Sequence, residues 1–170
     1  MKFDAIIAIA SGQPDPLIMP FLTPSIQCKE LILLSSDNAI KNGWVSNIKD
    51  ALKSKGIVIT SVPFEQSEGL DDLERVLSHV ISDKSKQFAF NANGGTKPMG
   101  LIAYEHCFGE DIPVMYLEGN KLTWVNKADQ QLEPLSIKQT LKDHEYFASH
   151  GFKIIEKDAE FIIGQNIKTL

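Results

Sequence analysis

The residues with the clearest chemical potential form one segment, Asn91-Ala-Asn-Gly-Gly-Thr-Lys-Pro-Met99, which follows a short apolar run. Its two adjacent glycines can adopt backbone angles that other residues avoid, so their N–H groups can converge on one point. Thr96 is suited to cap a following helix, and Pro98 suits that helix's first turn. The helix N-terminus adds about half a unit of positive charge, and Lys97 adds a full one. The segment therefore predicts a strand-to-helix turn that binds a phosphate or a carboxylate.

Two familiar phosphate-binding motifs do not describe this segment. A Walker A loop requires G-x-x-x-x-G-K-[ST], whereas here the lysine follows the threonine and no earlier glycine has the right spacing. The dinucleotide-binding pattern G-x-G-x-x-G is also absent from the sequence. A simpler interpretation is a tight turn with an ordinary helix cap, but such a turn needs neither Lys97 nor two flanking asparagines.

Two further polar loops follow apolar runs in the same way. Ser11-Gly-Gln-Pro14 ends the run at 3–10, and Ser35-Ser-Asp-Asn38 ends the run at 31–34. In open parallel sheets, ligands bind beyond the carboxyl ends of the strands, near the point where the strand order reverses. We therefore expect all three loops to build one site. The residues expected to bind its ligand are Ser11, Gly12, Gln13, Ser36, Asn38, Asn91, Asn93, Gly94, Gly95, Thr96, Lys97 and Met99.

The elements that must position these loops alternate between strand and helix. Continuous apolar runs indicate buried parallel strands, and apolar residues at helical spacing indicate amphipathic helices. Strands are expected at 3–10, 31–34, 57–62, 88–90 and 114–117, and helices at 39–55, 70–82 and 98–108. This alternation predicts an α/β fold, a Rossmann-like doubly wound and mainly parallel sheet with right-handed crossovers. Residues 121–126 are expected to complete a C-terminal β-hairpin with the fifth strand.

The chain after Asn126 has a different, more polar character. We expect a helix at 136–149 and a short strand at 152–156, followed by a linker or the start of another helix. The predicted organisation is a Rossmann-like domain at 1–126 and a C-terminal extension or linker at 127–170, with a short helical segment.

Composition limits the class of protein. The 170 residues can bury the core of one full domain, and 43% hydrophobic with 23% charged residues is ordinary for a globular protein. The net charge of −5 argues against general nucleic-acid binding, so no DNA binding is expected of this domain. The apolar stretch at 5–10 is too short to span a membrane, and a cytoplasmic location is expected.

The remaining polar and aromatic residues are assigned structural roles. Cys28 and Cys107 are far apart and form no C-x-x-C pair, so neither a zinc site nor a disulfide scaffold is indicated, and we expect no metal and no cofactor. The spacing of His144, Glu145 and His150 does not match a zinc-protease helix, and all three are expected to be solvated.

Two aromatic side chains need separate treatment. His79 falls among the core-facing positions of its expected helix and is assigned to the core. Trp44 follows the second polar loop by a few residues, and it is assigned mainly to packing. A role for Trp44 in stacking on a bound base stays open.

The segment at 91–99 also resembles the signature of a known family. Asn91-x-Asn-Gly-Gly-Thr-Lys-x-Met99, placed after the fourth expected strand, is similar to the signature of CARF domains, the CRISPR-associated Rossmann folds. The resemblance is greatest to the sensors of type III CRISPR effectors that join a CARF domain to a restriction-type nuclease domain. Gln13-Pro14 ahead of an apolar helix with Pro20, and Ser149-His-Gly-Phe152, are similar to further family segments, so the resemblance covers about residues 1–155.

The resemblance implies a sensor that binds cyclic oligoadenylate, with cyclic tetra-adenylate as the expected ligand, in type III CRISPR antiviral signalling. It implies a homodimer with the ring across the two-fold axis. The signal would pass to a partner protein or to an effector domain, and whether the chain stands alone or is the sensor half of a longer effector stays open.

Two alternatives remain. Some CARF domains are metal-independent ring nucleases, and here Lys97, Thr96 and Ser11 would align a ribose 2′-hydroxyl with the phosphorus and neutralise the developing charge. A Rossmann-like enzyme acting on an ordinary mononucleotide is the more distant alternative.

Overall fold

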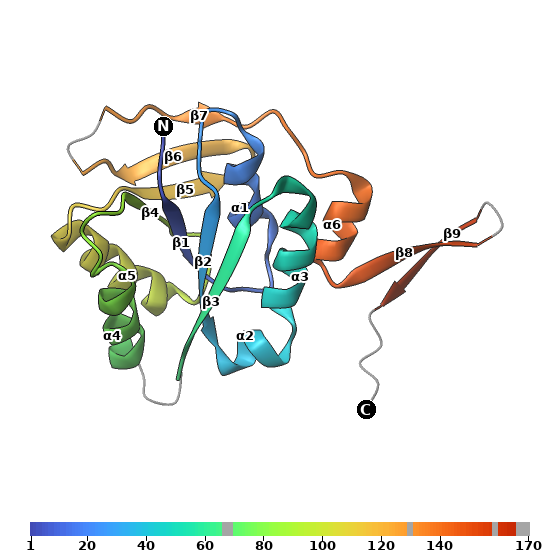
Figure 1. The fold of residues 1–170 in the computed structure, drawn as a ribbon, viewed down its shortest axis with the longest axis horizontal. Coiled ribbons are helices and arrows are strands. Elements are labelled where there is room, and N and C mark those ends of the chain that lie inside the picture. Colours follow the sequence, from blue (N-terminus) through green and yellow to red (C-terminus); the bar gives the residue numbers. More distant parts are fainter. Residues whose placement is uncertain (66–69, 129–130, 158–159, 166–170) are drawn as a thin grey trace.

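A seven-stranded sheet with the order β3-β2-β1-β4-β5-β6-β7 forms the centre of the molecule (Figure 1). The computed structural model describes residues 1–65, 70–128, 131–157 and 160–165. The strands are β1 (Ala5–Ile9), β2 (Glu30–Ser36), β3 (Val58–Phe64), β4 (Phe88–Asn91), β5 (Val114–Glu118), β6 (Lys121–Asn126) and β7 (Leu135–Ser136). The first five are parallel, whereas β6 and β7 are antiparallel. The predicted Rossmann-like, mainly parallel sheet with its hairpin is confirmed.

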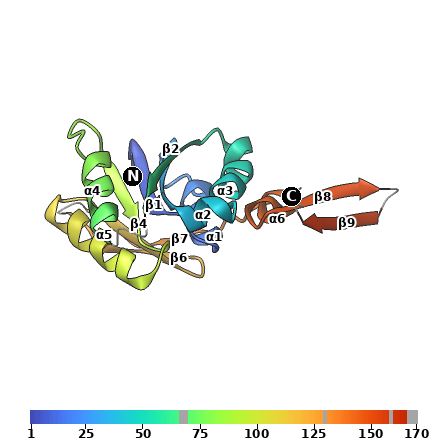
Figure 2. The same ribbon diagram turned by 90° about the horizontal axis from the view of Figure 1, so that it is seen from below.

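Helices cover both faces of this sheet (Figure 2). In β1, Ile6 and Ala8 belong to the core that packs with α3 (Trp44–Leu52), while Ile7 and Ile9 belong to the core that packs with α4 (Leu70–Val80) and α5 (Lys97–Gly109). A strand buried on both faces must be apolar at every position, which is why it appears in the sequence as a continuous run. The helices are α1 (Asp15–Ile18), α2 (Asp37–Lys41), α3 (Trp44–Leu52), α4 (Leu70–Val80), α5 (Lys97–Gly109) and α6 (Asp143–Ser149), with short 3-10 helices at Met19–Leu22 and Lys53–Lys55.

The strand order reverses beside β1. The chain first builds β2 and β3 on one side of β1 and then returns to place β4 on the other side. The loops that leave β1 and β4 therefore diverge, and the carboxyl ends of these two strands border a crevice. This is the position expected for the site.

The expected single helix at 39–55 is wrong. It is divided into α2, α3 and a terminal 3-10 turn. Gly43 causes the division because it adopts φ = 73°, a left-handed conformation that interrupts helical hydrogen bonding and that glycine adopts without strain. As a result Trp44 begins a new helix directly beside the loop that follows β2.

The expected helix at 136–149 is also wrong, because only its last part is helical. Leu135–Ser136 forms β7, which pairs with β6 through Leu135 opposite Leu122 and Ser136 opposite Lys121. Ile137 continues this attachment, since its N–H donates to the Asn120 carbonyl at 2.8 Å and its side chain is buried. The open edge of β6 gains a partner in this way, and the helix begins only at Asp143.

The segment after α6 forms a hairpin. The expected strand at 152–156 is present as β8 (Phe152–Lys157), but the next residues form β9 (Glu160–Gln165) rather than a linker or helix. Residues 166–170 lie outside the described part of the chain. The hairpin projects away from the sheet beyond α6 (Figures 1 and 2). The domain boundary expected at 126 stays a prediction, although β7 joins the central sheet.

The helix α6 is attached to the domain through a buried carboxylate. Glu145 is 3% exposed, accepts a hydrogen bond from the Ser54 hydroxyl at 2.7 Å and forms an ion pair with Lys55 at 2.9 Å. It also accepts from the backbone N–H of Lys142 at 3.0 Å. Burial acts to raise the pKa of Glu145, but these hydrogen bonds and the Lys55 ammonium outweigh burial and lower the pKa to about 2. The expectation that Glu145 is solvated is therefore wrong.

Glu145→Gln is expected to lower the free energy of unfolding at neutral pH by roughly 1.5–3 kcal/mol, the usual contribution of a hydrogen bond to a charged group. The folded-state pKa lies below the ordinary value of 4.5, so the stabilisation by the carboxylate is complete above that pH. It is lost as the pH falls from there towards about 2. Urea unfolding across this range should show a larger acid-dependent loss of stability in the native protein than in Glu145→Gln, because other carboxylates with a lowered pKa, such as Asp72, are common to both.

Glu133→Gln is the matched control, because Glu133 is exposed and has no hydrogen bond or ion pair within the described residues. Equal stability of the two variants would contradict the role of Glu145 in holding α6.

Candidate functional site

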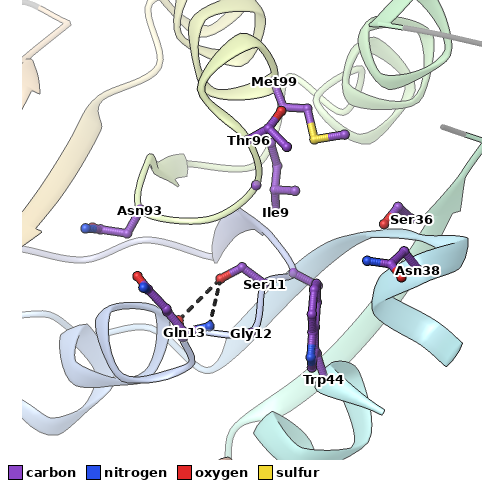
Figure 3. Close-up of a pocket in the computed structure, with 12 residues that line it drawn as sticks. Ile9, Ser11, Gly12, Gln13, Ser36, Asn38, Trp44, Asn93, Thr96 and Met99 are labelled. Atoms are coloured by element: carbon purple, nitrogen blue, oxygen red, sulfur yellow. Dashed lines mark hydrogen bonds between the residues drawn. The ribbon is translucent and has the colours of Figure 1, made fainter. Parts of the chain in front are cut away.

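A cavity of about 530 Å³ lies at the crevice beside β1, between the loops that follow β1, β2 and β4 (Figure 3). Three residues outside the expected ligand-binding set also line it: Ile9, Ala10 and Trp44, whose stacking role the sequence left open. Ile9 and Ala10 could have been predicted from their place at the end of β1, because the residues just before the loop that follows a strand border the same crevice. Nine of the expected residues line the cavity: Ser11, Gly12, Gln13, Ser36, Asn38, Asn93, Gly95, Thr96 and Met99. Three do not: Asn91, Gly94 and Lys97.

The turn after β4 is pressed against the end of β1. A Cβ atom on Gly94 would lie 1.8 Å from the carbonyl oxygen of Ile9, a distance that no real side chain can occupy. Gly95 adopts φ = 78°, and a Cβ there would lie 2.9 Å from Cγ2 of Ile9. Gly94 is therefore required by the close approach of two backbones, and Gly95 by its left-handed φ and by the Ile9 side chain. Convergence of their N–H groups on an anion stays a prediction.

The two asparagines hold this turn in place. The Asn91 side chain is fully buried; its amide nitrogen donates to the Pro16 carbonyl at 2.8 Å, and its oxygen accepts from the Asn93 N–H at 3.1 Å. The Asn93 amide pairs with the backbone of Leu117, donating to its carbonyl at 2.7 Å and accepting from its N–H at 2.8 Å. Asn91 thus has a positioning role, and its expected contact with the ligand stays a prediction. Asn93 combines positioning with a place in the cavity wall.

The helix α5 begins at the edge of the cavity. Thr96 occupies its N-cap position with the extended backbone of a cap, but its side chain makes no capping hydrogen bond. The expected cap is therefore correct in position and wrong in its hydroxyl contact. Lys97 is exposed and makes no hydrogen bond or ion pair within the described residues. The first N–H groups of a helix lack internal partners, so this edge of the cavity offers donors and partial positive charge.

The first loop is ordered by its own serine. The Ser11 hydroxyl donates to the Gln13 carbonyl at 3.3 Å and accepts from the Gln13 N–H at 3.4 Å, as the dashed lines in Figure 3 show. This is a local side-chain-to-backbone turn, and it fixes the loop across the cavity from Thr96.

The loop after β2 supplies the third wall. The Ser36 hydroxyl accepts from the Ala39 N–H at 3.3 Å and thereby caps α2. The Asn38 side-chain oxygen accepts from the Asn42 amide at 2.8 Å. Trp44, the first residue of α3, stands beside this loop and the Ser11 loop (Figure 3).

The described residues that line the cavity carry no formal charge. Attraction of an anion therefore depends on the N-terminus of α5 and on Lys97 just outside the wall. Among the residues with described positions, no three His, Cys, Asp or Glu side chains gather in an arrangement that could hold a metal ion. His79 is exposed on α4, contrary to its assignment to the core, because the helix turns Val76 and Leu77 inward instead.

The family can now be assigned. Residues 6–146 match the family model described as the Card1 CARF domain. The chain belongs to the CARF family. None of the curated proteins matches it, and in the described part of the chain no helix has both the length and the apolar character to cross a membrane.

Solved structures show the same fold. Can2 from Sulfobacillus thermosulfidooxidans, in complex with cyclic tetra-adenylate, has 20% identity and a TM-score of 0.76, covering 91% of this chain and 43% of Can2. Protein VC1899 from Vibrio cholerae has 16% identity and a TM-score of 0.80, covering 92% of this chain and 41% of VC1899. A type III CRISPR defence DNA nuclease activated by cyclic oligoadenylate has 18% identity and a TM-score of 0.69, with 92% of this chain and 25% of the nuclease covered. This CARF domain thus spans less than half of each of these chains.

Proposed function

We propose that this CARF domain is a sensor that binds cyclic oligoadenylate, with cyclic tetra-adenylate as its ligand, in type III CRISPR signalling. The observation that carries the proposal is the cavity at the reversal of the strand order, bordered by the glycine turn and by the N-terminus of α5. Membership of the CARF family supports the class of ligand, as does the likeness in fold to Can2 in complex with cyclic tetra-adenylate.

The shape of the ligand indicates two copies of the chain. A cavity of about 530 Å³ is in the range that holds one drug-sized molecule, whereas cyclic tetra-adenylate contains four nucleotides. One cavity therefore accommodates only part of the ring. Two copies related by a two-fold axis present two such cavities and two α5 N-termini to a ring that can adopt the same symmetry.

The outer face of α5 is the surface on which we place this dimer. Ala103 and Cys107 are buried against the sheet, yet Leu101 and Phe108 on the opposite face are 70% and 61% exposed. The Tyr104 and Phe108 rings stack with centroids 6.3 Å apart and extend this apolar face. A helix that is apolar on both faces is typical of an element that is covered on both sides. Because α5 begins at the cavity, contact along this helix brings the two cavities towards one axis.

Leu101→Glu is expected to convert the dimer to a monomer and to weaken ring binding at least tenfold, because a carboxylate in an apolar interface is desolvated without a partner. Size-exclusion chromatography with light scattering measures the mass, and calorimetry with the ring measures the affinity. Val58→Glu is the control, since Val58 is 59% exposed on β3, the edge strand on the other side of β1 from β4 and β5. An unchanged mass in Leu101→Glu would remove α5 from the interface.

One experiment separates the proposal from its alternatives. Purified protein is incubated with labelled cyclic tetra-adenylate in the presence of EDTA. Retention of intact ring supports the sensor, whereas appearance of linear di-adenylate supports a metal-independent ring nuclease that uses Ser11, Thr96 and Lys97. Binding of AMP or ATP without binding of the ring supports a mononucleotide enzyme and contradicts the proposal. We include in this proposal that the signal passes to an effector domain or to a partner protein.

A further inference from the structure

The wall of the cavity opposite α5 is built for a flat, neutral group rather than for a phosphate. Trp44 lies in this wall at the start of α3, half-buried. The backbone of the Ser11 loop rests on its ring, since a Cβ on Gly12 would lie 3.2 Å from both Cε2 and Cζ2 of the indole and 3.4 Å from Nε1. The Cβ position is almost equally distant from Cε2 and from the two atoms bonded to it, Cζ2 and Nε1. Gly12 therefore lies over the face of the ring rather than at its edge. The Ser11 loop thus packs against one face of the indole.

Hydrogen-bond donors accompany this ring. The Asn38 side-chain oxygen is engaged by Asn42 at 2.8 Å, which leaves its amide N–H groups pointing towards the cavity (Figure 3). Within the described residues these N–H groups have no acceptor, and neither does the indole N–H of Trp44. Adenine presents ring nitrogens that accept hydrogen bonds and a π-face that stacks on aromatic side chains. The N-terminus of α5, with its partial positive charge, lies in the opposite wall, so this wall favours a base over a phosphate.

We propose that Trp44 and Asn38 form the adenine subsite of the cavity, with Trp44 stacking on one base and Asn38 donating to its ring nitrogens. This inference rests on the proposed function, and it assigns the phosphates and the bases of the ring to different walls of the cavity. The glycine turn and the α5 N-terminus hold the phosphates, and the wall formed by Asn38 and Trp44 selects the base. Trp44 therefore contributes affinity for a base, and the donors of Asn38 supply the discrimination between bases.

The chain allows a direct test because it contains two tryptophans, Trp44 and Trp124. Trp124 is buried at 5% exposure, lies outside the cavity, and its indole N–H has no partner, so Trp124→Phe removes no hydrogen bond. In Trp124→Phe all tryptophan fluorescence comes from Trp44. Titration with cyclic tetra-adenylate should quench this fluorescence. The same titration of Trp44→Phe, which retains only Trp124, should leave the fluorescence unchanged.

Affinity measured by calorimetry provides a second readout that does not depend on fluorescence. Trp44→Leu keeps an apolar side chain without a π-face and is expected to weaken binding by roughly 5- to 150-fold, the contribution of one stacked base. Trp44→Phe keeps a ring and should lose only about threefold. Thermal unfolding of both variants confirms that each remains folded.

The outcomes distinguish this inference from the proposed function. The adenine subsite is overturned if the ring binds tightly to Trp124→Phe without quenching its fluorescence, and if Trp44→Leu and Trp44→Phe bind the ring with equal affinity. The proposed sensor function is unaffected by that result. Absence of ring binding to the native protein overturns the proposed function and this inference together. Quenching together with the expected order of affinities supports both.

Discussion

Gly94→Ala is expected to destabilise the protein by roughly 2–4 kcal/mol and to abolish measurable binding of the ring. The added methyl group would have to occupy a position 1.8 Å from the Ile9 carbonyl oxygen, so either the turn or the end of β1 must move. Both elements border the cavity, and a shift of either changes its shape. Urea unfolding and calorimetry with cyclic tetra-adenylate measure the two effects.

Gly100→Ala is the matched control for this prediction. Gly100 lies in the first half of α5, and a Cβ there would meet no atom within 4 Å. Alanine in a helix is favoured over glycine by roughly 0.5–1 kcal/mol, so this variant should be slightly more stable than the native protein. If Gly94→Ala behaved like Gly100→Ala, the close approach between the turn and β1 would not exist in solution.

Lys97→Ala is expected to weaken binding of the ring by one to two orders of magnitude, which corresponds to roughly 1.5–3 kcal/mol for a lost charged hydrogen bond. Lys97 is exposed beside the cavity, and the described lining residues carry no charge. Its ammonium is therefore the group best placed to reach a phosphate from the edge of the site. Because the contact is exposed, the loss should be largest at low ionic strength.

Lys138→Ala removes an exposed lysine outside the cavity and changes the net charge by the same amount. A comparison of the two variants separates a local contact from a general effect of charge on a polyanionic ligand. Equal affinities of Lys97→Ala and Lys138→Ala would exclude Lys97 from the site and leave the α5 N-terminus as the source of attraction.

Much of the fold follows from the sequence because each signal is local. A strand buried between two layers of helices must be apolar throughout, and this is visible in Ala5–Ile9 without knowledge of any partner. The three loops were placed together for a general reason, since the carboxyl ends of parallel strands share one edge of a sheet. The two adjacent glycines before a helix also mark a turn with unusual backbone angles, whereas their contact with Ile9 is visible only in the structure.

The errors concern contacts between residues distant in sequence. Glu145 looks like a solvated helix residue until α6 packs on α3, which brings it to Ser54, 91 positions earlier. The segment at 135–136 becomes a strand only because β6 offers it an open edge. Gly43 interrupts a helical pattern that otherwise continues, and periodicity does not report the φ angle of a glycine.

The glycine turn after β4 shows both contributions. Its residue types and their spacing predict an anion-binding turn and determined its place at a strand's carboxyl end, since conformational freedom, helix polarity and charge are properties of the local chain. The tertiary structure decided which residues position the turn and which line the cavity. It buried Asn91 against Pro16, left Lys97 outside the wall and placed Trp44 within it. Those roles depend on which surfaces meet when the sheet and its helices pack, and no local pattern encodes that.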